Sequence, residues 1–148
     1  RICNRLLFPP EKGSVYTRAM TLNTCFIPRL WRICGALLAA SGTIMGALTA
    51  HLPDTRFAQG GRAMAHNAME VQMWHALALV VLGLTLTQRP TRLLAAGGCG
   101  LLLGTLLFCG GVYYTAFTGQ HAAHIAPTGG SLLIVSWCVL AASWAKRA

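Results

Sequence analysis

The sequence predicts an all-α polytopic membrane protein, with four transmembrane helices in an antiparallel bundle. Of its 148 residues, 55% are hydrophobic and only 10% are charged, whereas soluble domains carry about 25% charged residues. Four apolar stretches each approach the roughly 20 residues that cross a hydrocarbon core of about 30 Å. Short polar links join them, so we expect a single membrane domain over residues 20–148.

Residues 1–19 differ from the rest of the chain. They begin with Arg1, contain Pro9 and Pro10, and show no sustained hydrophobic period. Met20 is followed by a short polar lead and then by the first apolar stretch. We therefore expect residues 1–19 to be a non-native or disordered N-terminal extension, with Met20 as the true initiator.

The first and third predicted helices, at about residues 30–50 and 93–117, carry small residues at helical spacing. Gly42 and Gly46 in the first, and Gly100 and Gly104 in the third, are small-xxx-small pairs that let two helix backbones approach closely in lipid. We assign these four glycines to helix packing. We expect the glycine ridge of the third helix to pack against the first helix. The fourth helix is predicted at about residues 128–144.

The second helix, predicted at about residues 69–86, is where polar groups come into the apolar part of the chain. The residues from Arg62 onward look helical and are expected to lead into it without a break. Gln72 and His75 lie about 60° apart on one helical face, whereas Glu70 lies about 140° from His75 and is placed to pair with His66. Glu70, Gln72 and His75 are our candidate intramembrane polar site. A structural role in hydrogen bonding between helices is favoured over proton relay, because a relay needs a chain of titratable groups.

The basic residues lie at the ends of the apolar stretches and set the orientation. Six lie on the side of the two termini and the second link, against Arg56 and Arg62 on the other side. The six are Arg29, Arg32, Arg89, Arg92, Lys146 and Arg147. This asymmetry predicts a multi-pass protein of the bacterial inner membrane with both termini in the cytoplasm. The net charge of +9 is explained in this way, and no nucleic-acid partner is expected. Tyr113 and Tyr114 are expected in an interfacial belt.

All five histidines fall on the side away from the termini. His51, His66, His121 and His124 are weak candidates for an outward-facing metal site. They lack the carboxylate-backed context of known zinc motifs, so no metal and no cofactor is expected. The six cysteines form no CxxC pair, and no disulfide framework is expected.

Four sequence blocks occur in an order that resembles a known family. They are Gly46 to His51, Gln72 with His75 to Leu79, Leu106 to Gly119, and Ile125 to Gly130 with Trp137. Together they resemble the YgdD/YwdK-like family of small integral membrane proteins, over about residues 30–147. The resemblance implies a four-helix plasma-membrane protein with no established activity. The chain departs from the family pattern at Leu48-Thr49, Val71 and Cys109-Gly110.

These observations lead to three functional hypotheses. The first is a non-enzymatic accessory or scaffolding component, whose partners are the lipid bilayer and either another membrane protein or further copies of itself. The second is a small oligomeric transporter or proton-coupled carrier that uses Gln72 and His75. The third and weakest is outward-facing metal binding. No nucleophile–base–orienter set and no phosphate-binding loop occurs in the sequence, so an enzyme is not expected.

Overall fold

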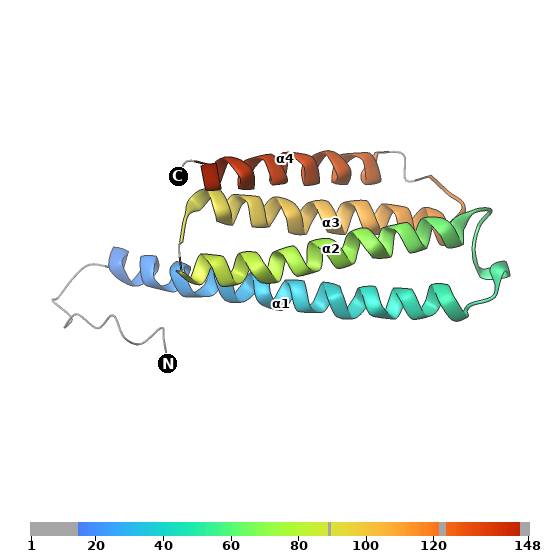
Figure 1. The fold of residues 1–148 in the computed structure, drawn as a ribbon, viewed down its shortest axis with the longest axis horizontal. Coiled ribbons are helices and arrows are strands. Elements are labelled where there is room, and N and C mark those ends of the chain that lie inside the picture. The colour runs from blue at the N-terminus through green and yellow to red at the C-terminus, as the bar shows by residue number, and fades with distance from the viewer. Residues whose placement is uncertain (1–14, 89, 122–123, 146–148) are drawn as a thin grey trace.

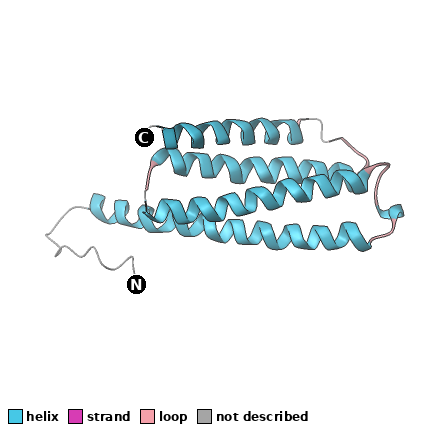
Figure 2. Ribbon diagram, viewed as in Figure 1, coloured by secondary structure: helices cyan, strands magenta, loops and turns pink. Residues whose placement is uncertain are grey.

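The computed structural model describes residues 15–88, 90–121 and 124–145. The described chain forms four long helices and one short 3-10 turn, with no strand in these ranges (Figures 1 and 2). In order they are α1 (Val15–His51), η1 (Asp54–Arg56), α2 (Gly61–Gln88), α3 (Arg92–Thr118) and α4 (Ile125–Ala145). The predicted all-α class and the four helices are confirmed.

Each helix runs antiparallel to the next and packs mainly on its neighbour in sequence. The central pair is α2 and α3, with α1 against α2 on one side and α4 against α3 on the other (Figure 1). The link between α2 and α3 lies at the end of the molecule where the chain starts and finishes. The other two connections lie at the opposite end, which we call the loop end (Figure 1).

All four helices are long and apolar enough to cross a membrane. The first apolar segment is Phe26–His51, with 26 residues. The shortest of the four is Ile125–Ala145, with 21 residues. At 1.5 Å per residue, even the shortest reaches about 30 Å. The 28 residues of α2 exceed this length, so its polar first turns are expected to lie outside the hydrocarbon.

Large apolar side chains cover the outside of the molecule, and the interior combines large apolar residues with small and polar ones. Trp74, Ile134 and Leu37 are 72%, 68% and 65% exposed. The interior contains glycine, alanine and leucine together with Gln72, Thr105, Ser136 and Ser143. In water such a surface would be a large exposed apolar patch. In lipid it is the expected outer surface.

The observed helices are longer than the apolar stretches predicted. α1 begins at Val15 rather than near Leu30 and contains Pro28, so it includes the last five residues of the segment expected to be an extension. Residues 1–14 lie outside the described chain, and an initiator at Met20 stays a prediction. α2 begins at Gly61, which confirms that the helix continues through Arg62.

The prediction that the glycine ridge of α3 packs against the first helix is wrong. A Cβ added to Gly100 would meet Ser136 Oγ, and one added to Gly104 would lie 2.8 Å from Leu133 Cδ2 and 3.1 Å from the Gly129 carbonyl oxygen. These partners all belong to α4. The glycine of α3 that faces α1 is Gly98, where an added Cβ would lie 2.9 Å from the Trp31 indole. The glycine spacing defines the packing face of α3 but leaves its partner open.

Gly42 and Gly46 of α1 face α2. A Cβ on Gly42 would lie 2.8 Å from Met73 Sδ, and one on Gly46 would lie 3.9 Å from Met69 Cε. Gly42 therefore makes the close approach between α1 and α2 possible, and Gly46 contributes less to it.

Candidate functional site

The Gln72 side chain is the centre of the polar interior and joins three helices. Its exposed fraction is 4%. Its Nε2 donates to the Leu38 carbonyl oxygen at 2.9 Å and to Ser41 Oγ at 2.8 Å, both on α1. Its Oε1 accepts a hydrogen bond from the Tyr113 hydroxyl of α3 at 2.9 Å. Both amide donors and the carbonyl oxygen are therefore engaged, as a buried amide requires.

The surroundings of Gln72 explain why it can be buried. Ser41 Oγ donates to the Leu38 carbonyl oxygen at 3.0 Å, which leaves its lone pairs for Gln72. Gly42, one residue along α1, leaves room for the amide, because a Cβ there would lie 3.5 Å from Gln72 Nε2. We call Ser41, Gln72 and Tyr113 the interhelical amide cluster.

Tyr113 belongs to this cluster rather than to an interfacial belt. It is half-buried and points inward to Gln72, whereas its neighbour Tyr114 is exposed and donates to Gln120 Oε1 at 3.0 Å. Tyr113 therefore does not face outward as a residue of such a belt would, and the depth of both tyrosines in the membrane stays a prediction. Nearby, the buried Cys109 thiol donates to the Ala68 carbonyl oxygen of α2 at 3.3 Å, which adds a second polar link between α2 and α3.

His75 lies one turn further along α2 but faces a different neighbour. Its Nδ1 lies 2.7 Å from the Val71 carbonyl oxygen, and its Nε2 accepts from the Trp137 indole N–H of α4 at 3.2 Å. A carbonyl can only accept and an indole N–H can only donate. Both contacts are satisfied together by the neutral imidazole with its proton on Nδ1. His75 thus joins α2 to α4.

Glu70 completes the predicted polar site in sequence but not in space. Its carboxylate lies 3.8 Å from His66 Nδ1, with 57% of each side chain exposed, as the i to i+4 spacing predicted. Gln72 faces α1 and α3, His75 faces α4, and Glu70 faces outward. The three candidate residues therefore occupy three separate environments and do not line a common site.

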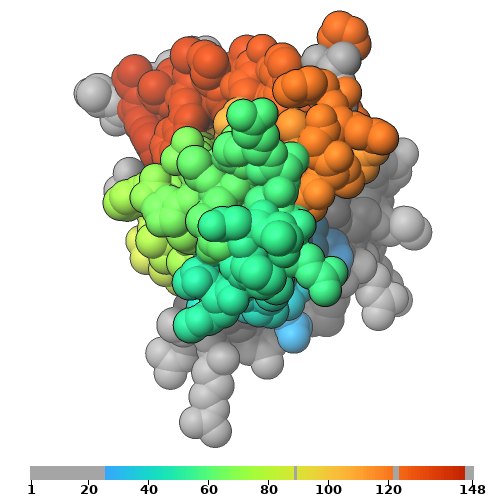
Figure 3. Space-filling model, turned by 90° about the vertical axis from the view of Figure 1, so that its right-hand side faces the viewer, coloured from blue at the N-terminus to red at the C-terminus, as the bar shows by residue number. Residues whose placement is uncertain are grey.

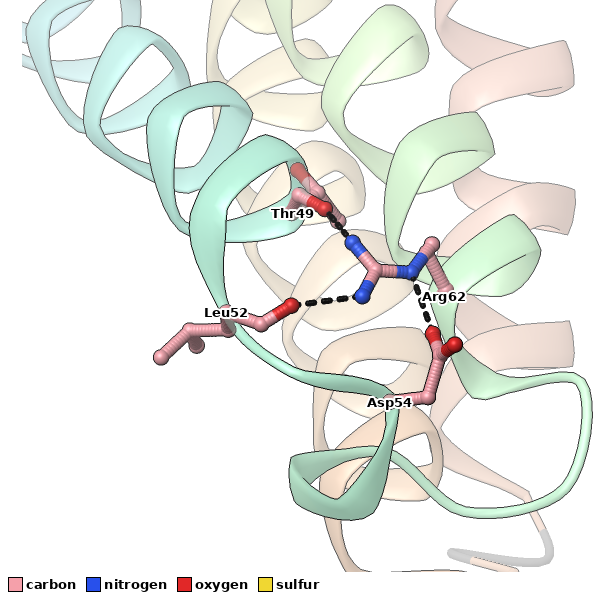
Figure 4. A network of polar contacts seen from close by, with 4 residues as sticks. All are labelled: Thr49, Leu52, Asp54 and Arg62. Atoms are coloured by element: carbon pink, nitrogen blue, oxygen red, sulfur yellow. Dashed lines mark hydrogen bonds and ion pairs between the residues drawn. The ribbon is translucent and has the colours of Figure 1, made fainter.

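At the loop end, Arg62 of α2 holds the end of α1 (Figure 4). Its guanidinium donates to the Thr49 carbonyl oxygen, to the Leu52 carbonyl oxygen at 2.5 Å, and to Asp54 Oδ1 at 2.8 Å. The Thr49 carbonyl belongs to the last turn of α1 and Leu52 follows directly after the helix; at this end four acceptors lack helical partners and the helix dipole favours a cation. The role of Arg62 as a helix cap was not predicted, because the sequence shows only its charge.

The first connection also covers the end of α3. The Ala58 N–H donates to the Ala116 carbonyl oxygen at 2.9 Å, and Phe57 stacks on Phe117 with ring centroids 5.1 Å apart. Arg62 lies 4.8 Å above the Phe57 ring. In Figure 3, which looks onto the loop end, this connection and the start of α2 cover the middle of the surface, with α4 above them.

The four weak metal candidates are at the loop end but do not form a metal-binding group. His51 ends α1, His66 lies in the first turns of α2, and His121 and His124 both precede α4; all four are exposed. Within the described residues, no three His, Cys, Asp or Glu side chains are close enough together to hold a metal ion. The hypothesis that these histidines form a metal site is not supported by this arrangement.

Comparison with known proteins decides the family. Residues 45–130, more than half of the chain, match the family described as "Protein of unknown function (DUF423)". The chain belongs to the DUF423 family. The matched residues include the amide cluster residues Gln72 and Tyr113, the Gly104–Gly129 contact and the Arg62 cap.

Relatives of this DUF423 protein carry the name UPF0382 membrane protein. The one from Staphylococcus epidermidis is 31% identical over 121 residues, which are 81% of this chain and 98% of the relative. The one from Staphylococcus haemolyticus is 30% identical, covering 80% and 97%, and that from Haemophilus influenzae is 29% identical, covering 71% and 87%. No solved structure matches the chain significantly. The finer resemblance to YgdD/YwdK-like proteins stays a prediction.

Proposed function

We propose that this DUF423 protein is a non-enzymatic accessory or scaffolding component of the bacterial inner membrane, with both termini in the cytoplasm. In this role the protein acts by presenting helix surfaces to another membrane protein or to further copies of itself. The observation that carries the proposal is the complete internal pairing of Gln72. A residue that served a solute would keep a donor or an acceptor free for it.

The distribution of the other polar groups supports the same role. The Cys109 thiol and the His75 imidazole are each bonded to a neighbouring helix. Hydrogen bonds of this kind contribute about 0.6 kcal/mol each in membrane proteins, rising to about 1.7 kcal/mol. They therefore stabilise the bundle, whereas a carrier would need Glu70, Gln72 and His75 to face one pathway.

The outer face of α1 is a suitable surface for a partner helix. α1 packs on α2 and leaves its opposite side open. That side carries small exposed residues at i, i+4, i+7, i+11 and i+14: Ala36, Ala40, Thr43, Ala47 and Ala50. Small residues at this spacing let a second helix approach closely in lipid.

The described basic residues support the proposed orientation. Arg29, Arg32 and Arg92 lie at the end of the molecule away from the loop end. Arg56 and Arg62 lie at the loop end, where Arg62 is paired with Asp54 at 2.8 Å. The side with more lysine and arginine residues near the membrane is the cytoplasmic side, and acidic residues contribute little to this preference.

Site-directed photocross-linking in native membranes tests the proposal. A photoreactive amino acid placed at Ala40 or Ala47, on the open face of α1, is expected to give a discrete cross-linked protein band. The same group at Leu77, an exposed residue of α2, is the matched control and is expected to label lipid alone. Equal protein labelling at all three positions, or none at any, would argue against a partner surface on α1.

A further inference from the structure

We propose that a groove on the outer side of α3 binds one phospholipid of the membrane leaflet at the loop end. One acyl chain lies against Leu106, Leu107 and Gly110, and the headgroup meets Gln120 and His121. This inference is independent of the accessory function, because it concerns a different helix and a lipid ligand.

The groove has a volume of about 500 Å³. Its lining is Leu106, Leu107, Gly110, Gly111, Tyr114, Gln120, His121 and Ile125. The five lining residues of α3 follow the spacing i, i+1, i+4, i+5 and i+8, which places them on one helical face. From Tyr114 to Leu106 the groove runs about 12 Å along the helix, most of the depth of one leaflet, which is about 15 Å of hydrocarbon.

Gly110 is the residue that the packing of this protein does not explain. A Cβ added to it meets nothing within 4 Å, whereas one added to the adjacent Gly111 would lie 3.0 Å from the Ala126 nitrogen. Glycine within a helix costs about 1 kcal/mol relative to alanine. Gly111 gains close contact with α4 in return. Gly110 gains no contact within the described chain and instead deepens the groove, so we infer that it makes room for a ligand.

The groove is apolar at one end and polar at the other, as a phospholipid is from its acyl chains to its headgroup. Its deep end is made of leucine and glycine, and its end near the membrane surface carries Tyr114, Gln120 and His121. The Tyr114 hydroxyl donates to Gln120 Oε1 at 3.0 Å, which holds the amide with its N–H donors on the other branch. Together with the exposed His121 imidazole, these groups suit phosphate and ester oxygens.

Charge and surroundings favour a lipid over any other ligand. None of the groove-lining residues is acidic, so a phosphate meets no repelling carboxylate there. α3 has the most apolar spanning segment of the four helices, with a mean hydropathy of 2.0. The deep part of the groove therefore lies where acyl chains are the surrounding medium.

Photolabelling of the full-length protein in proteoliposomes tests this inference. The probe is phosphatidylethanolamine with a diazirine in the middle of one acyl chain, present as a minor fraction of the lipid. Mass spectrometry is expected to find the label concentrated on Leu106, Leu107 and Gly110. Gly110→Trp, which fills the groove, should lower labelling of this segment severalfold. Leu103→Trp, a change at an exposed position of the same helix outside the groove, should leave it unchanged.

Two results would overturn the proposal. One is labelling spread evenly over the lipid-facing residues of all four helices; the other is undiminished labelling in Gly110→Trp. If Gly110→Trp does not fold, the double variant Gln120→Ala/His121→Ala decides, because both residues lie outside the helices. It should also lower labelling severalfold, and wild-type labelling in this variant would refute the site.

Discussion

At the scale of single residues, Gln72 shows how a polar side chain is accommodated inside a membrane protein. A buried amide costs several kcal/mol when its hydrogen bonds are not made. Here α1 supplies two acceptors and α3 supplies one donor. The residue therefore fixes the relative positions of three helices.

Replacing Gln72 tests its structural role. Gln72→Leu removes three hydrogen bonds and leaves the Tyr113 hydroxyl without its acceptor, so the free energy of unfolding should fall by about 2 kcal/mol, at about 0.6 kcal/mol per bond or more. Tyr113→Phe removes one bond and should cost about a third as much. Both are measurable by steric trapping in detergent or bicelles. Glu70→Gln, at an exposed position, is the control and should leave stability within about 0.5 kcal/mol. Equal stability of Gln72→Leu and wild type would contradict the role.

Helical arithmetic predicted part of this site and missed the rest. It correctly separated Glu70 from His75 and paired it with His66. It placed Gln72 and His75 on one face of α2, about 60° apart. That angle is large enough for Gln72 to contact α3 while His75 contacts α4. Likewise, adjacent residues of a helix point about 100° apart, so Tyr113 and Tyr114 face different surroundings. The sequence alone does not say which one turns inward.

At the scale of elements, α3 and α4 pack backbone to backbone. A Cβ on Gly129 would lie 2.8 Å from Phe108 Cα and 2.9 Å from the Gly104 carbonyl oxygen. Such close contact increases dispersion attraction and allows Cα–H···O contacts.

The sequence revealed these small-residue ridges, but a ridge fits any partner helix. Hydropathy also located the membrane-crossing parts and not the helix ends, so the start of α1 was missed.

Two adjacent glycines of α4 provide a matched test of this interface. Gly129→Ala forces the α3 and α4 backbones apart and should lower the free energy of unfolding by about 1–3 kcal/mol. Gly130→Ala places its Cβ in ordinary contact, 3.5 Å from Phe108 Cδ2. It should be neutral or stabilise by up to about 1 kcal/mol through helix propensity. SDS titration followed by circular dichroism measures both. Equal effects of the two changes would show that the close approach does not matter.

At the scale of the whole molecule, large apolar residues cover the outside, and the interior combines leucines with small residues and a few polar side chains. This distribution, the four spanning helices and the family all agree on a multi-pass membrane protein. Composition was sufficient to predict that class, because lipid contact requires apolar surface on every helix. Composition could not show whether the interior is filled by packed side chains or contains a polar pathway for a solute. That distinction depends on the orientation of Gln72, Cys109 and Tyr113.

The central claim is that this interior is packed and closed to water. It is tested most directly by the accessibility of Cys109, whose side chain is buried next to the amide cluster. In a variant that retains only this cysteine, a cationic methanethiosulfonate reagent applied to both sides of the membrane should not modify Cys109 until SDS unfolds the protein. In the same background without Cys109, His51→Cys, at the exposed end of α1, should react at once. Rapid modification of Cys109 in the folded protein would show a water-filled path through the bundle and would contradict the account.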